Sequence, residues 1–221
     1  MCPAERNAAG VLDRLSAILE SFDDSHQRLS LSELARRSGL PKSTTHRLVA
    51  DLLRLELLEH LDGRLQLGMR IFELGELVPR RRGLVDAAAP FMTDLRSATG
   101  QTVHLAVLDD HEVVYLHIVA GTGAKRLPSR VGGRLPCHAT GVGKAILAFS
   151  PSELVAAVLE APLAKLSPYT IVRPAVLARE LGTIHRSGIS LDREESSVGT
   201  SCVAAPVLGP DGLALAAISV S

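Results

Sequence analysis

Two segments of the sequence hold residue types that could act as catalytic groups. Cys137 and His138 are a thiol and an imidazole in adjacent positions, and Cys202 is a thiol later in the chain. A thiol activated by an imidazole base is a recurring arrangement in nucleophilic catalysis. Adjacent residues of a strand point to opposite faces, so Cys137 and His138 would not pair with each other. Cys202 could still pair with a distant histidine, so an enzyme remains the first alternative function.

The glycine-rich segment Gly141 to Ala145 does not match a nucleotide-binding loop. That loop requires Ser or Thr after its lysine, whereas Ala145 follows Lys144, and the earlier glycine of the loop is absent. The cysteines and histidines do not show the spacing of a zinc site. We therefore expect no catalytic site, no metal and no cofactor.

The clearest chemical signal is a local excess of positive charge. The chain is neutral overall, with 24 basic and 24 acidic residues. The segment from Leu34 to Ala50 nevertheless holds no acidic residue, and its basic residues are Arg36, Arg37, Lys42 and Arg47. A DNA-binding protein needs such a local basic face rather than a basic composition.

The elements around this segment have the layout of a winged helix-turn-helix. Apolar spacing predicts three helices: residues 9–22, residues 33–38, and a third with Pro41 at its first position. We expect Ser32 to cap the second helix and Gly39 to end it. Asp62-Gly63 lies between residues 57–60 and 64–67, and this is a hairpin signal that predicts the wing.

The third helix would enter the major groove of DNA. Its outward face carries Lys42, Ser43, His46 and Arg47, with Thr44 at the margin. A lysine and a serine at the helix start suit a phosphate, and an arginine suits a guanine edge. Arg36 and, on the hairpin, Arg64 are further candidate DNA contacts. Exposed basic residues are also common on ordinary helices, so a module that binds a partner other than DNA is the second alternative.

The rest of the chain predicts a linker and a second domain. Residues 68–78 and residues 84–98 have helical patterns, the second interrupted at Pro90, and the intervening run Pro79 to Gly83 is the best candidate for a boundary. Later helices are expected over residues 140–149, 151–159 and 174–187. Strands are expected over residues 103–107, 113–119, 125–131, 202–208 and 213–220. Hairpins with separate helices indicate an α+β domain with a mostly antiparallel sheet.

Composition and targeting signals bound the class of protein. The hydrophobic fraction is 46%, as in a globular protein that buries a core, and only 3% of residues are aromatic. The three cysteines show no pairing pattern, which favours a reducing compartment. The N-terminus lacks a signal peptide pattern, and no apolar run is long enough to span a membrane. We expect a cytoplasmic protein.

Motifs in order along nearly the whole chain resemble those of the IclR family of transcription regulators. The helix-turn-helix motif is LSLSELARRSGLPKSTTHRLVADL, and the linker motif is LGMRIFELG. The second half contributes Pro90, TGQTVHLAVLDDHEVVYLHIV, LPCHATGVGKAILA, SGISLDREESSVGTSCVAAPV and AAISVS. The wing differs from the family pattern in one respect, because Leu65 stands where an aromatic residue is common.

The resemblance implies a two-domain regulator of the α+β class. Residues 1–67 would form the winged helix-turn-helix, residues 68–83 a linker helix, and residues 84–221 a GAF-like effector-binding domain. The implied partners are double-stranded operator DNA, a small organic acid or other polar metabolite, and a second copy in a homodimer or tetramer, with no membrane partner. The family includes repressors, activators and proteins that do both, and we favour a repressor.

The resemblance also implies the residues of an effector pocket. The matching positions here are Gly141, Val142, Asp192, Cys202, Ser219 and Ser221. Gly141 and Val142 would supply main-chain groups at a helix start. We expect Asp192 to accept a hydrogen bond from a ligand hydroxyl or amine. Purely structural roles are the alternative: Cys202 as a small core residue, the glycines as close-packing positions, and Asp192 as a cap.

The family pattern usually continues beyond the position of Ser221. It then has a Gly-Pro segment and a final helix that packs on the sheet, whereas Ser221 is the last residue here. We expect apolar sheet surface to be exposed as a result. We also expect that adding a C-terminal helix raises the melting temperature.

Overall fold

The computed structural model describes residues 10–122 and 129–221, without the side chains of residues 79–82. The chain divides into two compact units, Met1–Pro79 and Arg80–Ser221, and each is described by itself. None of the described helices is both long and apolar enough to cross a membrane.

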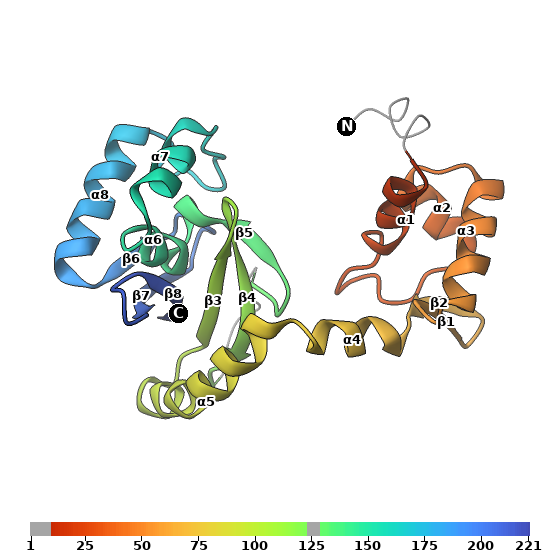
Figure 1. Cartoon of the computed structure of the whole chain (residues 1–221), viewed down its shortest axis with the longest axis horizontal. Coiled ribbons are helices and arrows are strands. Elements are labelled where there is room, and N and C mark those ends of the chain that lie inside the picture. The colour runs from red at the N-terminus through yellow and green to blue at the C-terminus, as the bar shows by residue number, and fades with distance from the viewer. Residues whose placement is uncertain (1–9, 123–128) are drawn as a thin grey trace. The chain divides into compact units, whose positions relative to one another are not determined.

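Three helices form the body of the first unit (Figure 1). They are α1 (Val11–Leu19), α2 (Leu31–Ser38) and α3 (Lys42–Arg54). Their facing sides bury Ile18, Leu34, Leu48 and Leu52 in one core. Gly39 ends α2 with a φ of 69°, the left-handed conformation that glycine adopts at helix ends.

A hairpin and a further helix complete the first unit. Strands β1 (Leu58–Leu61) and β2 (Arg64–Leu67) pair antiparallel, and α4 spans Met69–Glu76. Asp62 and Gly63 both have positive φ, 52° and 75°, as the predicted two-residue turn requires. Leu65 is buried in the core and exchanges main-chain hydrogen bonds with Leu29, so the wing packs without an aromatic residue.

The helix boundaries of the first unit differ from the prediction in several places. The first helix ends at Leu19 rather than Phe22, because the next residues form turns. Ser30, not Ser32, caps α2: its hydroxyl accepts from the Glu33 N–H while the Glu33 carboxylate accepts from the Ser30 N–H. Pro41 precedes α3 as its cap, since its ψ of 143° is extended.

The second unit is built on a six-stranded, fully antiparallel sheet of order β5-β4-β3-β8-β7-β6. The strands are β3 (Val103–Asp109), β4 (Glu112–Val119), β5 (Arg134–Pro136), β6 (Ser190–Arg193), β7 (Ser201–Leu208) and β8 (Ala214–Val220). Its helices are α5 (Pro79–Thr99), η2 (Cys137–Ala139), α6 (Gly141–Leu147), α7 (Ser152–Glu160) and α8 (Pro174–Ser187).

Helices cover both faces of this sheet. One core joins α6, α7 and α8 to sheet residues such as Ala106, Tyr115 and Ala217. A smaller core lies on the opposite face, where Met92 of α5 packs against Leu105 and neighbouring side chains. Part of that second face is uncovered, since Val203 is 50% exposed.

Several predictions for the second unit were wrong. An interruption was expected at Pro90, but α5 runs through Pro90 without a break. Met92, two residues later, packs on the sheet and holds this part of the helix in place. The strand expected over residues 125–131 falls mostly outside the described residues, and residues 129–131 are not in a strand. Strands β5 and β6 were not predicted; they are short, and β6 is largely polar.

Candidate functional site

The outward face of α3 carries the predicted DNA contacts. Lys42, Ser43, His46 and Arg47 are exposed, and Thr44 is half-buried. The opposite face of the helix is buried through Thr45, Leu48, Val49 and Leu52. The helix is therefore held by its apolar side while its basic side stays open to solvent, which is what docking in a groove requires.

The other arginines of the first unit differ in how far they are engaged. Arg36 is exposed on α2. Arg37 donates to the Ser21 carbonyl at 2.8 Å and to the Asp23 carboxylate at 2.6 Å, so it braces the end of α1. Arg64 donates to Glu33 Oε2 at 3.3 Å and to the Arg28 carbonyl at 3.3 Å. The predicted wing contact is thus also a brace between the hairpin and the start of α2.

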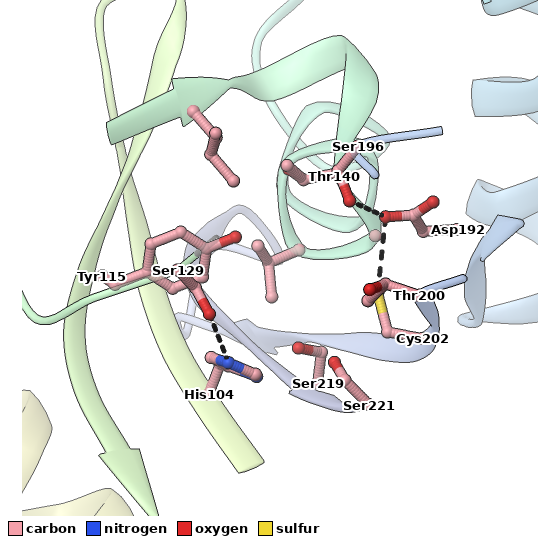
Figure 2. A pocket seen from close by; sticks show the side chains of 13 residues that line it. His104, Tyr115, Ser129, Thr140, Asp192, Ser196, Thr200, Cys202, Ser219 and Ser221 are labelled. Carbon is pink, nitrogen blue, oxygen red and sulfur yellow. Dashed lines mark hydrogen bonds between the residues drawn. The ribbon is translucent and has the colours of Figure 1, made fainter. Parts of the chain in front are cut away.

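A pocket opens beside α6, on the face of the second unit's sheet that α6 covers (Figure 2). The structure brings all six predicted effector residues into its wall: Gly141, Val142, Asp192, Cys202, Ser219 and Ser221. The prediction missed His104, Tyr115, Ser129, Leu135, Thr140, Ser196 and Thr200. The strand period offered a signal for His104, which alternates with apolar residues in β3.

Asp192 is buried and already accepts several hydrogen bonds. Its Oδ1 accepts from the Glu195 N–H at 2.7 Å, and its Oδ2 accepts from the Ser196 hydroxyl at 2.8 Å and the Cys202 thiol at 3.7 Å. A carboxylate offers about four acceptor positions, and three are already used, so about one acceptor position is left for a ligand. The predicted role and the structural role therefore coexist in one side chain.

Cys202 and Gly141 meet at the side of the pocket nearest to Asp192. Burial, with a further contribution from Asp192, raises the pKa of the Cys202 thiol to about 12, although hydrogen bonds from the Gly141 N–H and Ser221 oppose the rise. A Cβ on Gly141 would lie 2.9 Å from Cys202 Sγ. Only glycine fits there without displacing the thiol.

His104 and Tyr115 form another part of the wall. His104 Nε2 is 2.8 Å from the Ser129 hydroxyl, and its ring meets Tyr115 edge-on with centroids 5.5 Å apart. Burial lowers the pKa of His104 to about 4 and raises the pKa of Tyr115. Both rings are therefore uncharged near neutral pH.

Lys144 lies in α6, three residues after Gly141. Its side chain is fully buried beside the segment that carries Asp192. Its Nζ donates to the Leu191 carbonyl at 2.7 Å and to Glu195 Oε1 at 2.6 Å. Leu191 precedes Asp192 and Glu195 follows it, so one ammonium group fixes both sides of the pocket carboxylate. Burial raises the pKa of Glu195, and Lys144 opposes that rise. The sequence showed no sign of this role.

The geometry does not favour thiol catalysis. Cys137 and His138 lie in the 3₁₀ helix η2 rather than in the assumed strand, and both are buried. His138 Nε2 is bonded to the Ala164 carbonyl at 3.0 Å, and burial raises the pKa of Cys137 to about 12. A nucleophilic cysteine needs a lowered pKa, and both Cys137 and Cys202 have the opposite. Within residues 10–122 and 129–221, no group of three metal-binding side chains could hold an ion.

Two family models match the chain in the order of its units. Residues 11–62 match the IclR helix-turn-helix domain, and residues 78–221 match the C-terminal domain of the bacterial transcriptional regulator IclR. The chain belongs to the IclR family. Family membership identifies residues 11–62 as the helix-turn-helix domain of a DNA-binding transcription regulator.

Relatives agree with this assignment over most of their length. The chain is 34% identical to the HTH-type transcriptional regulator XynR of Escherichia coli strain K12, covering 95% of this chain and 84% of XynR. It is also 34% identical to the transcriptional repressor IclR of the same strain, covering 95% of this chain and 78% of that repressor.

A solved structure of an IclR homologue from Microbacterium hydrocarbonoxydans, in complex with 4-hydroxybenzoate, has the same fold. The TM-score is 0.84 at 32% identity, with 95% of this chain and 88% of the homologue covered. The α+β class, the helix-turn-helix and the antiparallel sheet of the second unit are thereby those of the IclR family.

Proposed function

We propose that this IclR-family regulator binds operator DNA through α3 and that a small polar effector in the second unit's pocket changes that binding. The observation that carries the proposal is the outward basic face of α3, with Lys42 and Arg47 exposed above a buried apolar face. Arg36, Ser43, Thr44, His46 and Arg64 are the other proposed DNA-contacting residues. The site of action would be the cytoplasm, where the DNA is.

The effector side of the proposal rests on the pocket. Its wall is rich in hydroxyl groups and contains the buried Asp192, as suits a small polar ligand. Gly141, Val142, Cys202, Ser219 and Ser221 are the other proposed effector-contacting residues. The homologue crystallised with 4-hydroxybenzoate supports a single-ring acid or similar polar metabolite as the class of effector.

We further propose that the regulator acts as a homodimer or a tetramer and as a repressor. Exposed apolar side chains lie along α4 and on the two residues after it: Met69, Phe72, Leu74, Leu77 and Val78. Such a row favours burial against another chain. The relative IclR is named a repressor, which supports the sign of regulation. Residues 68–83 would then link a DNA-binding domain of residues 1–67 to an effector domain of residues 84–221.

Fluorescence anisotropy with the DNA upstream of its own gene cluster tests the proposal. Binding should prefer that DNA over a scrambled duplex and should weaken steeply as salt rises. Arg47→Ala should lower the affinity by about 1–3 kcal/mol and relax sequence preference. Arg54→Ala, at the far end of the same helix, is the matched control. A shift that is equal on scrambled DNA, or no shift, would favour a module that binds another kind of partner.

Effector control is tested by adding small acids and hydroxylated compounds to the same complex. A compound that raises the melting temperature should also change the anisotropy titration of the wild type. If no compound in a broad panel changes DNA affinity, effector control is wrong.

A further inference from the structure

The pocket wall includes a tyrosine with a polar group at its tip. Tyr115 is 6% exposed and lines the pocket. Figure 2 shows this hydroxyl directed into the pocket. A tyrosine hydroxyl directed into a concave site is placed to donate a hydrogen bond to a ligand group.

Two neighbours fix the Tyr115 ring at its place. The His104 ring packs edge-on against it, and the Ser129 hydroxyl holds His104 at 2.8 Å. The Tyr115 hydroxyl can donate to a ligand, whereas one proton of the His104–Ser129 pair is used in the hydrogen bond between those two side chains. This group, called the donor end below, presents neutral donors and no negative charge.

The Asp192 part of the wall has the opposite character. Asp192 is the only side chain with a full charge among the described residues of the wall, and its carboxylate accepts rather than donates. A ligand carboxylate next to it would meet a like charge, whereas a ligand hydroxyl could donate to its remaining acceptor position. Figure 2 places Asp192 and the donor end on different sides of the pocket.

We propose that Tyr115, positioned by His104 and Ser129, binds a carboxylate or carbonyl group of the effector while Asp192 accepts from a hydroxyl or amine at its other end. The effector is then a small two-ended molecule, an acceptor group and a donor group joined by an apolar body. Leu135 and Val142 in the wall contact that body. This inference rests on the proposed function, because it assigns the orientation and class of the effector in that same pocket.

Three probes separate the two ends: benzoate carries only the acceptor group, phenol only the donor group, and 4-hydroxybenzoate both. Calorimetry on the full chain should show 4-hydroxybenzoate binding about tenfold or more tighter than either single-ended probe. Tyr115→Phe keeps the ring and removes only the hydroxyl. It should weaken benzoate and 4-hydroxybenzoate about tenfold and leave phenol unchanged. Asp192→Asn should weaken phenol and 4-hydroxybenzoate and spare benzoate.

Two further variants test the positioning role. His104→Phe keeps an aromatic ring beside Tyr115 but breaks the bond to Ser129, and Ser129→Ala breaks it from the other side. Both should reproduce a weaker form of the Tyr115→Phe pattern, with melting temperatures measured for every variant. A merely structural role would instead weaken all three probes equally.

The outcomes distinguish this inference from the proposed function. A Tyr115→Phe protein that binds every probe as the wild type does, or that loses phenol as much as benzoate, overturns the donor end. Wild-type protein that binds none of the three probes overturns the two-ended class. The proposed function fails separately, only if no compound of the broad panel alters DNA affinity.

Discussion

Asp192 and Cys202 are directly paired across β6 and β7, and the Cys202 thiol donates to Asp192 Oδ2 over 3.7 Å. The carboxylate disfavours the thiolate, and burial disfavours it more. The thiol therefore serves as a hydrogen-bond donor in the pocket wall rather than as a nucleophile.

Cys202 should be unreactive in the folded protein. A pKa raised from 9.0 to about 12 lowers the thiolate fraction at pH 8 about 1000-fold. In a Cys2→Ser background, Ellman's reagent should react slowly until urea unfolds the chain. Because the thiol has a higher pKa in the folded chain than in the unfolded chain, it contributes to the free energy of unfolding. That contribution is fully present below pH 9 and is lost as the pH rises toward 12. Rapid reaction of a folded thiol at pH 8 would contradict this assignment.

His104 should make the second unit acid-sensitive. Its pKa falls from 6.5 to about 4 because burial disfavours the imidazolium. A depressed folded pKa gives stability that is present above pH 6.5 and lost as the pH falls toward 4. Melting temperatures over that range should fall less steeply for His104→Gln than for the wild type. Parallel curves would mean that other groups carry the acid response.

Gly141→Ala should disable the pocket. Its Cβ would lie 2.9 Å from Cys202 Sγ, so the thiol must move away from Asp192. We expect at least a tenfold loss of effector affinity, and partial recovery when Cys202→Ala is added. Gly182→Ala in α8 is the control, because its Cβ would meet only the tip of Arg186 at 3.7 Å. Unchanged binding in Gly141→Ala would remove this contact from the site.

Lys144→Met should destabilise the second unit strongly. Removing the ammonium leaves buried Glu195 without its partner at 2.6 Å, a loss of about 3–5 kcal/mol for such pairs. Lys144→Met with Glu195→Met should recover much of the melting temperature, since the buried carboxylate is removed with its partner. Glu180, whose Oε1 is 3.6 Å from Lys144 Nζ, keeps its charge but is 28% exposed to solvent. Denaturant titrations of the wild type, the single and the double variant measure this. A single variant as stable as the wild type would show that the pair contributes little.

Arg64→Ala should loosen the hairpin more than it changes the salt dependence of DNA binding. Its bonds to Glu33 and the Arg28 carbonyl hold the hairpin to the start of α2. Glu33→Gln keeps Arg64 but weakens the brace, so the two variants should resemble each other. If Arg64 also neutralises a phosphate, only Arg64→Ala lowers the salt slope, by about 1.

Sequence signals predicted the elements whose ends are set by a proline or a glycine. Residues 174–187 were predicted as a helix and form α8 with those bounds, because Pro174 opens it and Gly188, at a φ of 73°, closes it. The Asp62-Gly63 turn was also predicted, because Asp-Gly readily adopts the positive φ values that a two-residue hairpin turn needs. Ser30 rather than Ser32 caps α2, and the prediction overlooked the Ser30-x-x-Glu33 spacing, which is the capping-box pattern.

The part of the pocket predicted from the sequence came from the family resemblance. The additions, His104 and Tyr115, lie on β3 and β4, far in sequence from Asp192, and only the sheet order brings them together. Lys144 was equally hidden, since a lysine in an apolar helix segment gives no indication of the carboxylate that pairs with it. Pro90 shows the same limit in α5, where packing on the sheet outweighs a local helix breaker.

The internal hydrogen bonds of Asp192 have a kinetic consequence. Its carboxylate is held by Glu195, Ser196 and Cys202 before any effector arrives. Binding at that end needs no ordering of side chains, so little conformational entropy is lost there. Effector association should therefore follow a single exponential whose rate increases linearly with concentration, the behaviour of a site that is assembled in advance.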